Sequence, residues 1–373
     1  MSERGASYWR PGDDPGGRRF VTLFADGVTF ESGDGLDSVT VAYETWGVLD
    51  ERRTNAVLVL HALTGDSHVA GPAGPGHPTP GWWNGLVGPG LAIDTEKFFV
   101  VCPNVLGGAQ GTTGPSSLDG AGRPYGSRFP RITVRDQVAV EVALADALGL
   151  ERWHAVVGGS MGGMRVLEWA VSQPGRVERA LVLAVGAAST SDEIALSALQ
   201  VRAIKADPHY YGGDYYGHVT APIEGLAIAR GIGQVTYRSS GEFQRRFGRS
   251  TQGDGDALRG GRYAIESYLG YHGEKLAARF DPNSYVVLSE AMNHHDVGRG
   301  RGGVAEALAH VTARTTVIGI DSDRLYPLPL QEELVRLIPD AGPLNVIGSD
   351  VGHDGFLLEV DQIAKVVETA LAE

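Results

Sequence analysis

Cysteine is almost absent from this chain, since Cys102 is the only one among 373 residues. A single cysteine excludes an intrachain disulfide and any metal site built from several thiolates. Long hydrophobic runs are also missing, and the longest, such as 180–188, fall far short of the roughly 18 residues of a membrane-spanning helix. The first twenty residues hold four arginines and no apolar stretch, so we expect no signal peptide. These absences predict a cytoplasmic protein with no membrane partner and no bound metal.

An excess of positive charge is missing as well. Lysine and arginine number 32 against 45 aspartates and glutamates, which leaves a net charge of −13. Because nucleic-acid phosphates require a basic protein surface, we expect no nucleic-acid partner. The residue in excess is glycine, with 53 copies, about twice the usual ~7%. No Gly-X-Y period accompanies it, so collagen is excluded and the glycines need a local explanation.

Short apolar runs alternate with helical patterns along most of the chain. These runs lack polar alternation, which is typical of parallel strands buried on both faces. A helix is predicted over 133–148, with Thr133 as its cap and Asp136 three residues later. Near the N-terminus, two extended runs flank Asp26-Gly27 and predict a hairpin. The predicted buried strands are 56–60, 98–102, 154–157, 180–184, 315–320 and 344–347.

The strand pattern is interrupted between residues 189 and 311. This block is polar, aromatic and basic, with helical stretches and no clear strand series. The strands resume at residue 315, and a last helix is expected over 357–371. An α/β pattern that stops and resumes predicts one mostly parallel, doubly wound sheet domain, 1–188 and 312–373, that carries an inserted helical lid, 189–311.

The sharpest motif is Gly158-Gly159-Ser160-Met161-Gly162, directly after a predicted strand and before a helical stretch. G-x-S-x-G in this context is typical of a nucleophile elbow, a tight turn that holds serine in a strained backbone conformation. The flanking glycines provide the room that this turn needs. A glycine-rich turn with a capping serine is the alternative, and the position between strand and helix favours a nucleophilic Ser160.

A serine nucleophile needs a base and an acid that orients the base, in the chain order Ser, Asp or Glu, His. His353 follows the last predicted strand and is the expected base. Asp321 and Asp323 both follow the strand before it. A residue slightly beyond a strand end reaches the base more easily, which favours Asp323, but the spacing leaves both open.

Other histidines and the oxyanion hole complete this hypothesis. His294-His295-Asp296 lies in the inserted block, and we interpret these as ordinary surface or packing residues, while His61 is expected to shape the loop after its strand. Two backbone N–H groups should bind the oxyanion, one from the residue after the nucleophile and one from the loop after an early strand. Met161 and Leu63 occupy those positions.

Runs over nearly the whole chain after Phe20 resemble the homoserine O-acetyltransferase family of the α/β-hydrolase superfamily. The resemblance places the family's triad on Ser160, Asp323 and His353 and its homoserine contacts on Arg230 and Asp354, with Tyr237 nearby. One departure is Ala109, where the family commonly has cysteine, outside the triad. The runs are His61–His68, Gly81–Trp83, Gly88–Gly90, Asn104–Gly108, Gly111–Pro115, Gly158–Gly163, Thr236–Ser239 and Ser322–Pro327.

The resemblance implies acetyl transfer from acetyl-CoA to the side-chain hydroxyl of L-homoserine, through acetyl-Ser160, in methionine biosynthesis. Arg230 suits the carboxylate of homoserine because its guanidinium is bidentate, and Asp354 suits the ammonium while also opening the last helix. No cofactor is expected beyond the co-substrate acetyl-CoA, and a homodimer through the lid is implied. The alternatives are a succinyl donor, a serine acceptor, or an esterase with the same triad.

Overall fold

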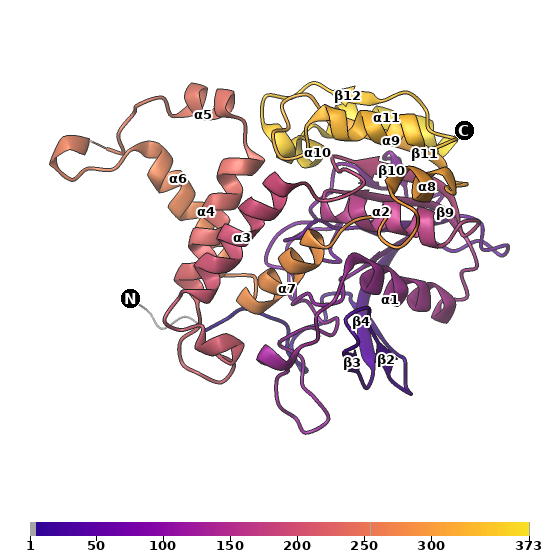
Figure 1. The fold of residues 1–373 in the computed structure, drawn as a ribbon, viewed down its shortest axis with the longest axis horizontal. Coiled ribbons are helices and arrows are strands. Elements are labelled where there is room, and N and C mark those ends of the chain that lie inside the picture. The colour runs from indigo at the N-terminus through magenta and orange to yellow at the C-terminus, as the bar shows by residue number, and fades with distance from the viewer. Residues whose placement is uncertain (1–4, 254, 373) are drawn as a thin grey trace.

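The computed structural model describes residues 5–253 and 255–372 of the chain. In this part, helices pack around an eight-stranded sheet (Figure 1). The strands lie in the order β1-β4-β8-β5-β9-β10-β11-β12. The pairs from β8 to β12 are parallel, whereas β4 is antiparallel to both β1 and β8. The bounds are β1 Arg19–Leu23, β4 Val39–Trp46, β5 Ala56–Leu60, β8 Phe99–Pro103, β9 Trp153–Gly159, β10 Val177–Leu183, β11 Arg314–Ile320 and β12 Asn345–Ile347.

The six predicted buried strands correspond to β5 and β8 to β12, with ends that differ by up to three residues. The predicted N-terminal hairpin is partly wrong. β1 and β4 do pair antiparallel, but Asp26-Gly27 does not connect them. That turn instead leads into a small ribbon of β2, Val28–Thr29, and β3, Gly35–Leu36. A second ribbon pairs β6, Val87–Gly88, with β7, Ile93–Asp94.

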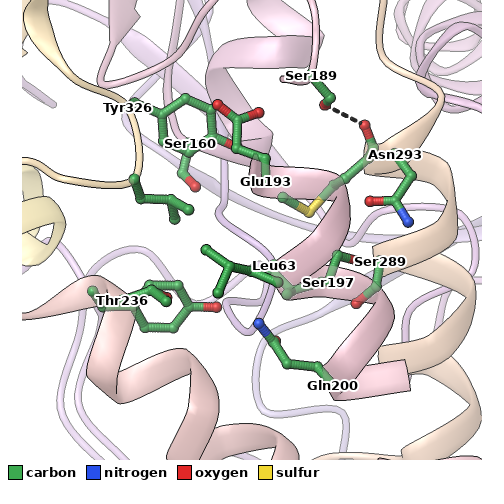
Figure 2. A pocket seen from close by; sticks show the side chains of 14 residues that line it. Leu63, Ser160, Ser189, Glu193, Ser197, Gln200, Thr236, Ser289, Asn293 and Tyr326 are labelled. Atoms are coloured by element: carbon green, nitrogen blue, oxygen red, sulfur yellow. Dashed lines mark hydrogen bonds between the residues drawn. The ribbon is translucent and has the colours of Figure 1, made fainter. Parts of the chain in front are cut away.

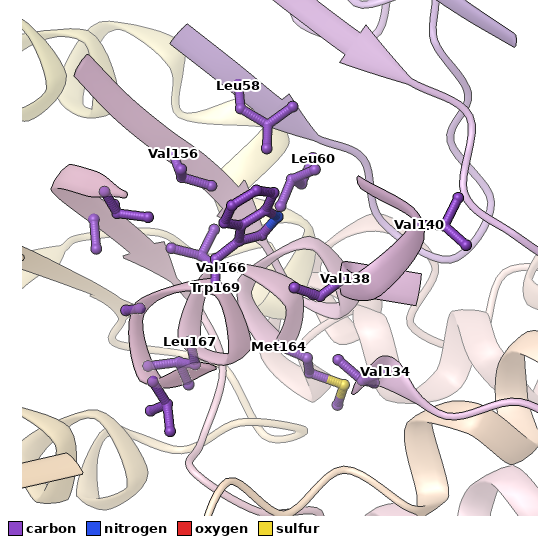
Figure 3. Packing of buried hydrophobic residues seen from close by; sticks show 14 of the residues in the cluster. Leu58, Leu60, Val134, Val138, Val140, Val156, Met164, Val166, Leu167 and Trp169 are labelled. Atoms are coloured by element: carbon purple, nitrogen blue, oxygen red, sulfur yellow. The ribbon is translucent and has the colours of Figure 1, made fainter. Parts of the chain in front are cut away.

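The central strand β5 is apolar and buried throughout because helices cover both faces of the sheet. Leu58 and Leu60 of β5 pack with α1, Val134–Ala147, and α2, Met161–Ser172 (Figure 3). Their neighbours Val57 and Val59 belong to a second cluster with α11, Val360–Ala372. The predicted capping box of Thr133 and Asp136 is present at the start of α1.

The predicted last helix is two helices, which corrects the sequence interpretation. α10 covers Gly355–Leu358, and α11 begins at Val360. Glu359 leaves the helical region, with φ −85° and ψ 50°, and its Oε1 accepts a hydrogen bond from Ser349 Oγ at 2.7 Å. The side chain of Asp354, which precedes α10, caps no backbone N–H there, so its expected capping role is wrong.

Most helices of the inserted block stand beside the sheet, at the left of Figure 1, whereas α8 lies at the right with the sheet. They join the sheet through an apolar cluster that includes Leu63 and Met161 together with lid residues such as Leu226 and Phe280. α8 differs, since Ala307 and Leu308 pack in the sheet's own core. The lid boundaries 189 and 311 therefore remain a proposal. α8 lies between them in the sequence but packs with the sheet. The bounds are α3 Ser191–Lys205, α4 Ile223–Tyr237, α5 Ser240–Arg246, α6 Ala264–Ala277, α7 Pro282–Asn293 and α8 Val304–Ala309.

Shorter elements complete the described chain. α9, Leu328–Leu337, packs against β11. Among the described residues, none of the helices has both the length and the apolar character needed to span a bilayer. The 3-10 turns are η1 Gly126–Arg128, η2 Tyr211–Gly213, η3 Ala257–Arg259 and η4 Gly352–Asp354.

Candidate active site

Ser160 stands on the turn between β9 and α2 with a backbone φ of 56° and ψ of −126°. A non-glycine residue at such a φ is strained, which is typical of functional turns. Two glycines make the turn possible. A Cβ on Gly162 would lie 2.1 Å from the carbonyl oxygen of Leu60, and one on Gly158 would lie 2.7 Å from the Gly162 carbonyl. The tight turn expected from the G-x-S-x-G motif is therefore present.

His353 and Asp323 form a close buried pair. His353 Nδ1 lies 2.6 Å from Asp323 Oδ2, and both side chains are nearly inaccessible to solvent. The other Asp323 oxygen accepts the backbone N–H groups of Leu325 and Tyr326 at 2.8 and 2.9 Å. Burial alone would lower the pKa of His353, but the charge and hydrogen bond of Asp323 more than offset it, so the pKa is raised. His353 Nε2 is buried without a hydrogen-bond partner among residues 5–253 and 255–372, as suits a base awaiting a proton.

The other aspartate and histidine candidates that the sequence offered lie elsewhere. Asp321 is exposed and accepts the backbone N–H of Ser349 at 2.9 Å, away from the base. His295 is buried with its Nε2 3.1 Å from the carbonyl oxygen of Gly186, and burial lowers its pKa to about 4. Of the two aspartates that the spacing left open, Asp323 is the one beside His353.

His61 anchors the loop that carries Leu63. Its Nε2 accepts the backbone N–H of Val105 at 3.1 Å, and its Nδ1 lies 2.8 Å from the carbonyl oxygen of Ala62. Burial, with the nearby Arg165, lowers the pKa of His61 to about 3, so the ring is neutral at physiological pH. The geometry agrees with the predicted loop-shaping role rather than with a base.

Beneath this loop lies a buried ion pair that the sequence did not indicate. The Arg165 guanidinium donates to Glu141 Oε1 at 2.6 Å and to the carbonyl oxygen of His61 at 2.5 Å. Trp169 Nε1 donates to the other Glu141 oxygen at 2.8 Å. Arg165 is fully buried, so this pair ties α1 and α2 to the end of β5 from inside the core.

Ser160 opens onto two small pockets that share Leu63 and Tyr237. One, of about 70 Å³, contains His353, Arg230 and Asp354. The Arg230 guanidinium lies 5.4 Å from the Tyr237 ring centre, and its Nε has no partner in the part of the chain that the structure describes. The predicted substrate residues are therefore gathered at one side of Ser160, with opposite charges facing the same pocket.

The second pocket, of about 50 Å³, lies at another side of Ser160. Figure 2 shows Glu193 and Tyr326 near Ser160, with Leu63 and polar side chains of α3 and α7 across the cavity. Sequence reasoning missed Glu193, although the pattern Thr190-x-x-Glu193 is a capping box that could have marked a helix start there.

Sequence reasoning also missed Arg238, which lies within the Thr236–Ser239 run of the resemblance. Its Nη1 donates to Asp354 Oδ2 at 3.2 Å, while Nε and Nη2 bind Glu242 at 2.7 and 2.5 Å. Arg246 binds the same Glu242 at 2.7 Å from the more exposed side. This chain of charges holds one oxygen of Asp354 in place.

Among the described residues, Glu44, His68 and His77 are grouped closely enough to hold a metal ion. Their polar atoms already have partners. His68 faces Glu44 Oε2 at 3.1 Å and the Pro72 carbonyl at 3.2 Å, and Arg18 lies 3.3 Å from His77 Nδ1. Burial disfavours the charges, yet Glu44 raises the pKa of His68, and hydrogen bonds lower the pKa of Glu44 to about 2. We interpret the group as a buried ion pair with Arg18 beside it, a poor environment for a metal cation.

Comparisons with known proteins agree with this architecture. Residues 55–360 match the family model described as the alpha/beta hydrolase fold. The homoserine O-acetyltransferase of Thermobifida fusca (strain YX) is 58% identical over 98% of this chain and 96% of its own length. The crystal structure of homoserine O-acetyltransferase from Bacillus anthracis is 27% identical, with a TM-score of 0.87 over 95% of this chain and 98% of that one.

Esterase E22 is similar to a comparable degree in structure, with 28% identity and a TM-score of 0.86 over 95% of this chain and 99% of that one. The full-length identity to the Thermobifida relative is about twice as high. On that identity and on the matching fold, the chain belongs to the homoserine O-acetyltransferase family of the α/β hydrolases.

Proposed function

We propose that the protein transfers an acetyl group from acetyl-CoA to the side-chain hydroxyl of L-homoserine. The observation that carries the proposal is the pocket beside Ser160 and His353, in which Arg230 and Asp354 offer one positive and one negative charge. A free amino acid presents a carboxylate and an ammonium, which these two side chains complement. Together with the family membership, this favours an amino-acid acceptor for the acyl group.

In the first half-reaction, Ser160 Oγ bonds to the thioester carbonyl carbon while His353 Nε2 takes its proton. The oxyanion would be bound by the backbone N–H groups of Leu63 and Met161. The C–S bond then breaks, CoA leaves as the thiol with the proton from His353, and Ser160 carries the acetyl ester. Asp323 holds Nδ1–H, so that Nε2 is the free base at the start of the step.

In the second half-reaction, the hydroxyl of homoserine takes the place of the thiol. His353 removes its proton, the hydroxyl oxygen bonds to the acetyl carbon, and the bond to Ser160 Oγ breaks. The proton returns to Ser160. Arg230 and Asp354 orient the acceptor, and Tyr237 lies against both pockets beside Arg230. The scheme is ping-pong, with no permanently bound cofactor.

The direct test is to incubate the protein with acetyl-CoA, with and without L-homoserine. Without homoserine we expect one equivalent of CoA, released as Ser160 is acetylated, whereas sustained release and O-acetylhomoserine should require homoserine. The similarity to esterase E22 makes hydrolysis the second candidate. CoA release at the same rate without homoserine would favour the hydrolase and contradict the transferase. The same assay with succinyl-CoA as donor, and with serine as acceptor, tests the alternative substrates.

The pH dependence of kcat/KM follows from the raised pKa of His353. As a base it must be neutral, so activity is present above that pKa and is lost as the pH falls through it. We expect the midpoint of the acid limb above the ordinary histidine value of about 6.5. The acid limb should persist in Glu193→Gln, with its midpoint moved to lower pH, because the charge of Glu193 contributes to the raised pKa of His353. A midpoint at or below about 6.5 in the unaltered protein would contradict the assignment of His353 as a base stabilised by Asp323.

Arg238 is proposed as a positioning residue for Asp354. Arg238→Met should raise KM for homoserine about tenfold, since a lost charged hydrogen bond is worth ~1.5–3 kcal/mol, and should leave KM for acetyl-CoA unchanged. Arg246→Met is the matched control, because within residues 5–253 and 255–372 Arg246 binds Glu242 and makes no hydrogen bond or ion pair with Asp354. Equal increases of both KM values in Arg238→Met would indicate a general structural role instead.

A homodimer through the lid is part of the proposal. Apolar side chains stand exposed on packed lid helices, with Ile228 and Val235 seven residues apart on one face of α4 and Tyr271 on α6. We expect light scattering after gel filtration to give twice the chain mass, and Ile228→Glu to reduce it toward one. A chain mass for the unaltered protein would overturn the dimer. A cytoplasmic location stays a prediction from the sequence.

A further inference from the structure

Glu193 is a buried carboxylate next to the nucleophile with no partner for one of its oxygens. Its Oε2 accepts the Thr190 backbone N–H at 3.2 Å, but Oε1 is buried without a hydrogen-bond partner within residues 5–253 and 255–372. The side chain is only 7% exposed. It lines the 50 Å³ cavity that contains Ser160 (Figure 2). The capping box accounts for the hydrogen bond between Oε2 and Thr190. It does not require Oε1, so this oxygen is available for a second role.

The cavity is suited to a short, uncharged group. Besides Glu193, the wall that the described residues form consists of neutral polar and apolar side chains, with neither lysine nor arginine. The pocket with Arg230 and Asp354 lies at another side of the serine. Four groups surround the tetrahedral carbon on Ser160: the serine oxygen, the oxyanion, the leaving or attacking group, and the acyl chain. If the acceptor occupies the charged pocket, the acyl chain is left with the cavity of Glu193.

We propose that Glu193 is a specificity-determining residue that rejects acyl groups ending in a carboxylate, such as succinyl, from the cavity beside Ser160. The inference rests on the proposed function and adds the basis of its donor choice. A succinyl chain differs from acetyl by an added methylene and carboxylate. Its carboxylate would meet a like charge and no cation, and like-charge contacts in a buried site are strongly unfavourable.

The size of the effect follows from the ionisation of Glu193. Burial is the main cause that raises its pKa, to about 7, with Asp323 adding to the increase and His353 and the Thr190 hydrogen bonds opposing it. Tyr237 and Tyr326 are the other titratable groups on the cavity wall. A succinyl chain can enter once Glu193 is protonated. That requirement costs about tenfold at pH 8 and almost nothing at pH 6, because each pH unit is a factor of ten.

The test measures formation of the acyl-Ser160 ester by intact-protein mass spectrometry, with acetyl-CoA or succinyl-CoA and no acceptor. For the unaltered protein, the succinyl-to-acetyl rate ratio should fall about tenfold between pH 6 and pH 8. Glu193→Gln should raise the ratio about tenfold at pH 8 and leave it nearly unchanged at pH 6. Glutamine also serves at this position of a capping box, so the helix start is preserved.

Thr190→Val is the matched control, since it weakens the same cap but keeps the carboxylate. It should lower the melting temperature and keep the fall of the ratio with rising pH, with the midpoint moved to higher pH, because the lost Thr190 hydrogen bond opposed the raised pKa of Glu193. The charge proposal is overturned if Glu193→Gln leaves the succinyl-to-acetyl ratio at pH 8 unchanged. It is also overturned if Glu193→Ala raises the ratio and Glu193→Gln does not, because the size of the side chain, rather than its charge, would then exclude succinyl. Should Glu193→Gln fail to fold, the pH dependence in the unaltered protein decides alone. An acetyl ester that forms but is not passed to homoserine would count against the proposed function and leave the test of Glu193 intact.

Discussion

Replacement of Ser160 by alanine should abolish acetyl transfer, with a decrease in kcat of at least about 10⁴-fold, because no other group can form the acyl-enzyme. The oxyanion hole and the substrate pocket would remain, and they account for whatever residual rate is left. Intact-protein mass spectrometry with acetyl-CoA should show the acetyl adduct on the unaltered protein and none on Ser160→Ala.

The thermal stability of variants at position 160 provides the control. Alanine keeps the strained φ of 56°, so Ser160→Ala should melt at nearly the same temperature as the unaltered protein. Ser160→Gly removes the steric cost of that conformation and should be more stable, by up to ~1–3 kcal/mol if the full strain is released. A Ser160→Ala variant that is active and becomes acetylated would refute the assignment of Ser160 as the nucleophile. A Ser160→Gly variant that is clearly less stable than the unaltered protein would contradict the claim that the backbone at position 160 is strained.

Replacement of Arg165 by methionine should lower the free energy of unfolding by ~3–5 kcal/mol. The guanidinium is fully buried, and its loss leaves the carboxylate of Glu141 in the core with Trp169 Nε1 as its one remaining donor among the described residues. The carbonyl oxygen of His61 also loses its hydrogen bond from Arg165. Urea unfolding monitored by circular dichroism measures the change.

The double variant Arg165→Met with Glu141→Leu is the informative control. Removing both charges of a buried pair is often neutral, so the double variant should recover much of the lost stability. Its catalytic rate should nevertheless stay reduced, because the loop from His61 to Leu63 still lacks its anchor. A single variant that loses less than about 1 kcal/mol would mean that Glu141 finds water or another donor.

Much of the fold could be predicted from local patterns. The uniformly apolar runs correspond to β5 and β8 to β12, and the capping box at Thr133 begins α1 as expected. Such features depend on neighbours along the chain, and so does the turn of Gly158 to Gly162 around Ser160. The errors were local as well. A two-residue ribbon after Asp26-Gly27 and the break at Glu359 are too short to alter a hydrophobic pattern.

Local residue patterns were enough to predict the class of fold, the position of Ser160 on its turn, and the order in which acid and base follow it. Tertiary packing was needed to show that Asp323, rather than Asp321, lies beside His353, and that Glu193 lines the cavity of Ser160. It also brought Arg238 to Asp354, 116 residues away along the chain. The physical reason is that a strand or a turn is encoded by adjacent residues. The direction and charge environment of a buried side chain depend on distant segments, which meet only when the lid packs on the sheet.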